Sequence, residues 1–114
     1  MNPLFSFFAK SNFENLSPEE FDKMLAEEKN AFLLDVRTKE EYKAYHIPGA
    51  KLIDISSIHF KDEIGKLDKN KNLLVYCASG ARSRSACNIL KQAGFEKVYN
   101  LSGGICGWKG AIER

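Results

Sequence analysis

Leu73-Leu74-Val75-Tyr76-Cys77-Ala78-Ser79-Gly80-Ala81-Arg82-Ser83 is the stretch that decides the fold. The apolar residues 73–76 are too few for a helix and predict a buried strand. Small residues around a glycine follow, and residues 84–93 have the spacing of a helix. The sequence therefore places Cys77 at the carboxyl end of a strand, just before a helix N-terminus. In open α/β sheets this is the position at which ligands bind.

The loop after this strand is suited to hold an anion. Its small residues allow successive backbone N–H groups to converge, and the next helix adds unpaired N–H groups and the positive end of its dipole. Lowering a cysteine pKa from ~8.5 to ~6.5 requires roughly 2.7 kcal/mol. Two or three charge-assisted hydrogen bonds of about 1.5–3 kcal/mol each supply that preference. We therefore expect Cys77 to be ionised without the help of a general base.

Length and composition limit the class of protein. With 114 residues the chain forms one domain, and a net charge of +2 without a basic cluster argues against nucleic-acid binding. Three cysteines without a C-x-x-C pair predict neither a disulfide scaffold nor a zinc site. Reduced thiols favour a cytoplasmic over a periplasmic location. No apolar run approaches the ~20 residues of a membrane span, so we expect no membrane partner.

Residues 1–11 form an apolar N-terminal arm ahead of a single domain over residues 12–114. Leu4, Phe5, Phe7 and Phe8 give the arm its apolar character. It lacks the positive leading region and the longer apolar run of a secretory signal peptide. We therefore expect a retained segment that packs on the domain or on a neighbour.

Strands and helices alternate along the rest of the chain. Ser17 with Glu20 and Thr38 with Glu41 form capping boxes that start two helices. The alternation predicts an α/β fold with a mainly parallel central sheet of about five strands and helices on both faces. The expected strands are 12–16, 31–36, 51–53, 73–76 and 97–101; the expected helices are 18–28, 39–45, 56–64, 84–93 and a final one carrying Ile105, Trp108 and Ile112 on one face.

The order of these motifs resembles the rhodanese family of single-domain sulfurtransferases over residues 13–108. The resemblance implies a rhodanese-like fold in which Cys77 accepts sulfane sulfur and carries it as a persulfide. The six-residue loop 77–82 has the length that this family associates with sulfur substrates. Related cell-cycle phosphatases use a loop one residue longer, which disfavours a phosphatase or an arsenate reductase. The segments that carry the resemblance are 33–37, 41–42, 46–50, 75–82, 94–95 and 103–104, together with Trp108.

The activity implied by the resemblance is that of a thiosulfate sulfurtransferase without a cofactor. The Cys77 thiolate would take sulfur from thiosulfate or another persulfide donor and pass it to cyanide or a thiol. A second hypothesis is a sulfur relay that hands its persulfide to a partner protein and has low turnover alone, which the apolar arm supports. A catalytically silent scaffold is disfavoured, because such modules commonly lack the cysteine.

The expected site consists of catalytic Cys77 and a substrate-binding loop. Arg82 either faces the bound anion or pins the loop from outside. Arg84 either faces solvent or guides an anionic donor to the pocket. Ser83 and Ser79 either donate hydrogen bonds to the persulfide or cap the helix, and the cap is preferred for Ser83. The loop residues expected to bind substrate are Ala78, Ser79, Gly80, Ala81, Arg82 and Ser83.

Asp35 and Arg37 are expected to support the site from the neighbouring strand. They either contact substrate or form a buried ion pair, and the pair is favoured because a carboxylate would repel an anionic donor. Cys106 departs from the family pattern. It either fills a small space or reaches the Cys77 pocket, where it would accept sulfur or resolve an oxidised Cys77 as a disulfide. Cys87 is expected to be structural. Two isolated histidines do not indicate a metal site.

Overall fold

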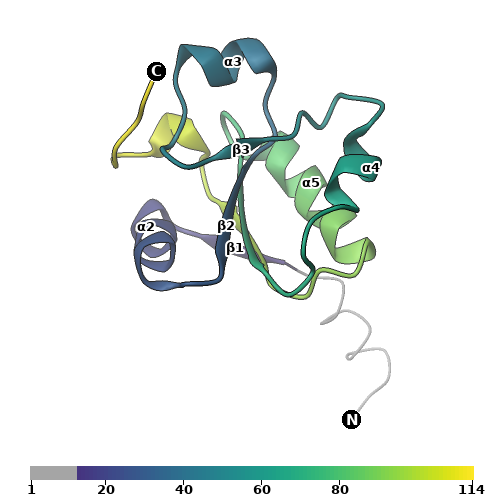
Figure 1. Cartoon of the computed structure of the whole chain (residues 1–114). Helices are drawn as coiled ribbons and strands as arrows, with labels where there is room; N and C mark the ends of the chain where they lie inside the picture. Colours follow the sequence, from purple (N-terminus) through teal and green to yellow (C-terminus); the bar gives the residue numbers. More distant parts are fainter. Residues whose placement is uncertain (1–12) are drawn as a thin grey trace.

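Strands and helices alternate throughout residues 13–114, which are the residues that this computed structural model describes (Figure 1). The predicted apolar arm over residues 1–11 lies outside the described residues. The elements in chain order are β1 (Glu14–Leu16), α2 (Pro18–Glu27), β2 (Ala31–Asp35), α3 (Lys39–Ala44), β3 (Lys51–Leu52), α4 (Phe60–Ile64), β4 (Asn72–Tyr76), α5 (Ala81–Gln92), β5 (Val98–Leu101) and the 3₁₀ helix η1 (Ile105–Gly107).

The five strands form one parallel sheet in the order β1-β5-β4-β2-β3. The central strand is β4, in which Val75 pairs with Leu34 of β2 on one side and with Asn100 of β5 on the other. Because parallel strands end at the same edge, the residues that follow β2, β4 and β5 meet there. The predicted α/β class and the strand count are confirmed, and Cys77 follows the middle strand.

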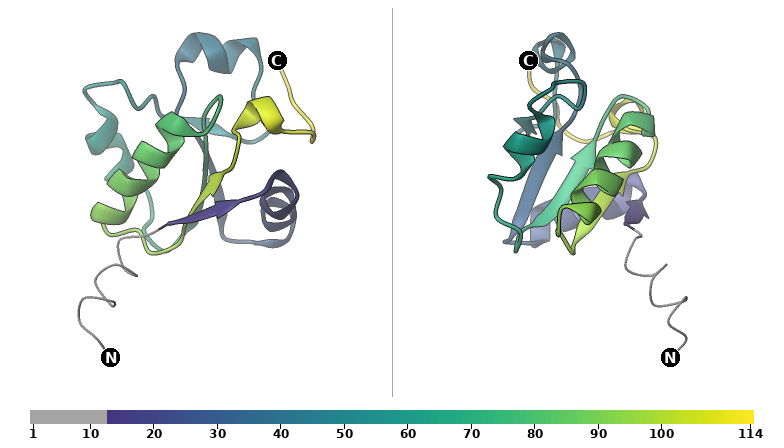
Figure 2. Two further views of the ribbon diagram at one scale, coloured as in Figure 1. Left: turned by 180° about the vertical axis from the view of Figure 1, so that it is seen from behind. Right: turned by 90° about the vertical axis from the view of Figure 1, so that its right-hand side faces the viewer.

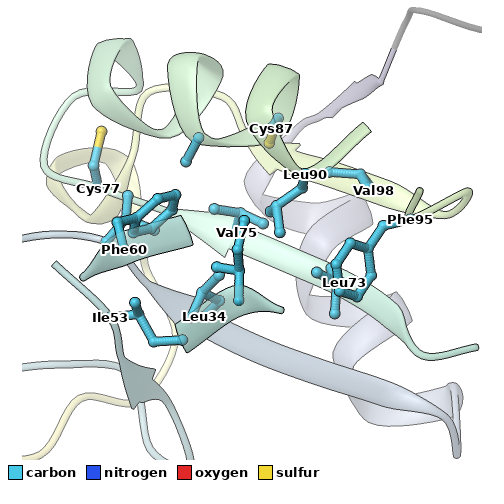
Figure 3. Packing of buried hydrophobic residues seen from close by; sticks show 13 residues of the cluster. Leu34, Ile53, Phe60, Leu73, Val75, Cys77, Cys87, Leu90, Phe95 and Val98 are labelled. Atoms are coloured by element: carbon cyan, nitrogen blue, oxygen red, sulfur yellow. The ribbon is translucent and has the colours of Figure 1, made fainter. Parts of the chain in front are cut away.

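Alternate residues of β4 supply two hydrophobic cores, one on each face of the sheet. Leu73 and Val75 pack with α4 and α5, whereas Leu74 and Tyr76 pack with α2 and η1. The views agree that α2 lies on one side of the sheet and that α4 and α5 lie on the other (Figures 1 and 2). Figure 3 shows the α5 side, where Cys77 lies at one end of the cluster. The site therefore rests on a strand that is buried on both faces.

A buried ion pair fixes the end of β2. The guanidinium of Arg37 donates hydrogen bonds from Nε and Nη2 to the Asp35 carboxylate, the shortest at 2.8 Å, and from Nη2 to the carbonyl of Tyr45 at 2.8 Å. Both side chains are almost fully buried. The structure thus places these residues in the ion pair that the sequence favoured, and the carboxylate faces Arg37.

The helix predicted over residues 56–64 is shorter than expected. Only the second half of that segment, α4, is helical. The Asp54 carboxylate accepts hydrogen bonds from the backbone N–H and the hydroxyl of Ser56, at 2.9 and 2.7 Å. These bonds hold the residues after Asp54 in a turn, so the prediction of a helix from residue 56 is wrong.

The final helix predicted through Ile112 is also wrong. Helical structure ends with η1, and Trp108 then adopts an extended backbone. The chain runs back along the turn after α3, where the backbones of His46 and Glu113 exchange two hydrogen bonds. Ile112 is consequently exposed, while Trp108 packs edge-on against Phe21. No helix in the described part of the chain is both long enough and apolar enough to cross a membrane.

Replacement of Asp35 by alanine is predicted to destabilise the fold by about 3–5 kcal/mol, because it leaves the buried Arg37 guanidinium without its counter-charge. Urea unfolding of Asp35→Ala measures this loss. Asp22→Ala removes an exposed carboxylate from α2 and should change the free energy of unfolding by less than about 0.5 kcal/mol. Equal stability of the two variants would show that the buried pair contributes little.

Candidate active site

The sulfur of Cys77 lies in a ring of backbone donors. The side chain is 1% exposed, and its Sγ accepts hydrogen bonds from the N–H groups of Gly80 at 3.1 Å and Ser83 at 3.2 Å. The Ser79 N–H also favours a negative charge on the sulfur. Cys77 lies next to the first turn of α5 (Figure 3). Convergent N–H groups of this kind bind anions.

The sulfur occupies the place of a helix-capping side chain. Helix α5 begins at Ala81, with Gly80 as its N-cap at a φ of 107°, which only glycine adopts without strain. An N-cap side chain normally accepts a hydrogen bond from the third helical N–H. That N–H belongs to Ser83 and donates to Cys77 Sγ instead. The expected helix start at residue 84 and the expected capping role of Ser83 are therefore wrong.

The Ser83 hydroxyl adds a donor that can turn toward the sulfur. Its Oγ lies 3.3 Å from Cys77 Sγ and 3.1 Å from the carbonyl oxygen of Gly80, to which it donates. A protonated thiol donates to this hydroxyl. Once the thiol ionises, rotation of the hydroxyl proton places a third hydrogen bond on the sulfur. Ser83 is fully buried, so no water competes for this position.

These hydrogen bonds favour the thiolate form of Cys77. Burial raises the pKa of its thiol, but the hydrogen bonds from the Ser83 hydroxyl and from the N–H groups of Ser83, Gly80 and Ser79 outweigh burial, and the net pKa is lowered. Cys87 has no such donors, and burial raises the pKa of its thiol far above the ordinary range. Of these two buried cysteines, Cys77 is the one whose surroundings favour the thiolate, while Cys87 packs in the core.

The turn after β5 holds the Cys77 loop through backbone hydrogen bonds. The N–H of Ile105 donates to the carbonyl of Cys77 at 2.9 Å, and the N–H of Cys106 donates to the carbonyl of Ala78 at 3.0 Å. Gly104 makes this approach possible, because a Cβ there would lie 2.3 Å from the oxygen of Ala78. In the sequence, the pair Gly103-Gly104 only contributed to the family resemblance. Its contact with the loop joins residues too far apart in sequence to be predicted from spacing.

Arg82 forms an ion pair with Glu41, so its positive charge has a partner without any substrate. Its Nη1 and Nη2 donate to the two carboxylate oxygens of Glu41 at 2.8 and 2.9 Å. Glu41 also accepts from the Thr38 N–H, so it closes the predicted capping box of α3. The hydrogen bond from Arg82 is the main cause that lowers the pKa of Glu41 to about 2. The sequence revealed the capping box but not this second contact.

The other predicted site residues lie around the ring. Arg84 is exposed, and its Nη1 would lie 3.4 Å from a Cβ at Gly80. Cys106 has its backbone against the loop and its side chain in solvent, and its role toward an oxidised Cys77 stays a prediction. The substrate-binding roles of the loop residues also stay predictions. Within residues 13–114 there is no cluster of three or more side chains that could hold a metal ion.

The sequence pattern of the rhodanese-like domain matches residues 17–111. The chain belongs to the rhodanese-like domain family. The crystal structure of a rhodanese-like domain protein from Staphylococcus aureus superposes with a TM-score of 0.78 at 30% identity, covering 89% of this chain and 97% of that one. The family resemblance read from the motifs is therefore confirmed.

Several relatives in this family are named for sulfur transfer. A protein named sulfurtransferase from Allochromatium vinosum is 34% identical over 93 residues, which are 82% of this chain and 85% of that protein. The putative sulfur carrier protein YrkF of Bacillus subtilis is 33% identical over 90% of this chain and 55% of its own length. The probable adenylyltransferase/sulfurtransferase MoeZ of Mycobacterium tuberculosis is 36% identical over 82% of this chain and 24% of its own length. This chain thus spans a quarter to about half of the last two relatives.

Gly104→Ala is predicted to disturb the ring without touching the sulfur. The added Cβ must displace the carbonyls of Cys77 and Ala78, and the φ of 62° adds strain, for a loss of about 1–3 kcal/mol of stability. As the amides move away, the Cys77 pKa rises, and each unit costs roughly tenfold in thiolate at neutral pH. Alkylation of the Cys77 peptide by iodoacetamide, followed by mass spectrometry, measures the effect.

Gly107→Ala is the matched control for this prediction, because a Cβ at that position meets no atom within 4 Å. It should keep the alkylation rate and the stability of the unmodified protein. If Gly104→Ala behaves in the same way as Gly107→Ala, the turn after β5 does not support the loop.

Proposed function

We propose that this chain is a sulfurtransferase that carries sulfane sulfur on Cys77 as a persulfide. The observation that carries the proposal is the buried Sγ bound by the N–H groups of Gly80 and Ser83. A thiolate preformed in this way is a nucleophile that needs no base. The names of its relatives from Allochromatium vinosum and Bacillus subtilis support sulfur as the group transferred.

In the first half-reaction the Cys77 thiolate attacks the outer sulfur of thiosulfate or of another persulfide donor. A bond forms between the two sulfurs, and sulfite or a thiolate leaves with the electron pair. Ala81 and Arg82 lie in the first turn of α5, where backbone N–H groups have no partner within the helix. They are the donors available to hold the outer sulfur of the Cys77 persulfide.

In the second half-reaction a thiophilic acceptor removes the outer sulfur. A thiolate or cyanide attacks that sulfur, and Cys77 leaves as the thiolate that the ring stabilises. The same hydrogen bonds that activate Cys77 as a nucleophile thus make it a good leaving group. Two half-reactions through one covalent intermediate predict ping-pong kinetics.

The second candidate is a relay that passes the persulfide to a partner protein with little turnover alone. The name of the Bacillus subtilis relative, a putative sulfur carrier protein, favours it. In that case the ring would load with sulfur from a donor but release it slowly to small acceptors. The cytoplasmic location remains part of this proposal, since both hypotheses depend on a reduced Cys77.

Incubation with thiosulfate or a small alkyl persulfide is predicted to add ~32 Da to the Cys77 peptide, the mass of one sulfur atom. Cyanide should remove the adduct as thiocyanate. Cys106→Ser should still load, whereas Cys77→Ser should not. Loading followed by slow release to cyanide and thiols would favour the relay. An active Cys77→Ser protein, or the absence of any adduct on Cys77, would end the proposal.

A further inference from the structure

The charges around the catalytic loop restrict the donors that the site can accept. Four of the loop side chains carry no charge: Ala78, Ser79, Gly80 and Ala81. The single charged side chain within the loop is Arg82, and both of its terminal nitrogens are bound to the Glu41 carboxylate at 2.8 and 2.9 Å. The guanidinium is therefore neutralised before any substrate arrives.

A second arginine near this edge of the sheet, Arg37, also has a carboxylate partner, and unlike the partly exposed Arg82 it is buried. Arg37 donates to both oxygens of Asp35, and it also donates to a backbone carbonyl. Arg84 has no carboxylate partner within residues 13–114, but it is exposed and lies beside Gly80 next to the turn after β5. Solvent and salt screen an exposed charge of this kind.

A sulfur donor with two negative charges is repelled at a site that combines the Cys77 thiolate with an already paired Arg82. Thiosulfate carries two negative charges and must approach Cys77 in its thiolate form, so three negative charges meet where Arg82 is already paired. A persulfide carries at most one negative charge at its reacting end, on the outer sulfur. Backbone N–H groups of the ring suffice to hold one such sulfur.

We infer that the Glu41–Arg82 ion pair sets the charge of the sulfur donor, and that the site is built for a thiol persulfide rather than for thiosulfate. The inference rests on the proposed function and names its substrate class. In the step it describes, the Cys77 thiolate attacks the outer sulfur of R–S–SH. The new S–S bond gives the Cys77 persulfide, the old S–S bond breaks, and R–S⁻ leaves with the electron pair. Glu41 acts here as a positioning and specificity-determining residue that does not touch the donor.

The test compares two donors, thiosulfate and the persulfide of N-acetylcysteamine. The second donor carries no charged group apart from its reacting sulfur. In ping-pong kinetics kcat/KM for each donor reports the first half-reaction alone. The readout is the ratio of kcat/KM for thiosulfate to kcat/KM for the persulfide. The unmodified protein should favour the persulfide. A general weakening of the loop would lower both values together and leave the ratio unchanged.

Glu41→Gln should raise this ratio by roughly fivefold or more, because it frees the positive charge of Arg82 beside the incoming dianion. Glutamine keeps an oxygen that can accept from Thr38, so the capping box of α3 is retained. Arg82→Gln should lower the ratio, because it leaves the Glu41 carboxylate unpaired. The double variant has a neutral pair and should return the ratio to near its original value. Glu40→Gln removes an exposed carboxylate from the same helix and should leave the ratio unchanged.

An unchanged ratio in both Glu41→Gln and Arg82→Gln would show that the pair is only structural, and would overturn the inference. So would faster use of thiosulfate than of the persulfide by the unmodified protein. A third contrary result is a ratio that falls in Arg84→Gln but does not move in Glu41→Gln, because Arg84 would then select the donor. Failure of the underlying sulfur-transfer proposal is visible separately, as the absence of a Cys77 adduct from either donor.

Discussion

The site depends on one constraint, which is that the N–H groups of Gly80 and Ser83 at the start of α5 donate to the sulfur of Cys77. The first turn of α5 has N–H groups without carbonyl partners, and a helix start buried against the core must find acceptors for them. No side chain of the N-cap residue can serve, because that residue is Gly80. The cysteine at the end of β4 supplies the acceptor. The folded chain therefore needs an electron-rich atom where the Cys77 sulfur lies, so the contact that satisfies the helix start also favours the thiolate form of Cys77.

Every other feature of the site keeps that sulfur in place. The central position of β4 in a parallel sheet fixes the backbone of Cys77 from both sides. The turn after β5 binds the carbonyls of Cys77 and Ala78, and Glu41 ties the far end of the loop to α3 through Arg82. The loop is thus held by the sheet, by the turn after β5 and by α3. A preorganised ring of this kind needs little rearrangement to hold an anionic sulfur.

Local sequence patterns predicted the parts of the molecule that depend on near neighbours. The capping boxes, the buried strands and the place of Cys77 between a strand and a helix were all expected from residues a few positions apart. Long-range contacts were not predicted, because only the fold brings Glu41 to Arg82 and Gly104 to Ala78. Ser83 was misassigned because a serine before helical spacing resembles a cap, whereas the true acceptor, the Cys77 sulfur, lies six residues earlier. The prediction of a final helix was wrong because the end of the chain pairs through Glu113 with His46 instead.

The most direct test of this account is a pH titration of the Cys77 thiolate by its ultraviolet absorbance, in a Cys106→Ser protein. Cys87 stays protonated, because burial raises its pKa. The lowered pKa of Cys77 means that the folded protein retains its thiolate as the pH falls below the ordinary cysteine value of ~8.5, whereas the same chain unfolded in urea should not. Ser83→Ala should move the folded midpoint upward. A folded midpoint at or above that of the unfolded chain would contradict the claim that the ring holds Cys77 ionised.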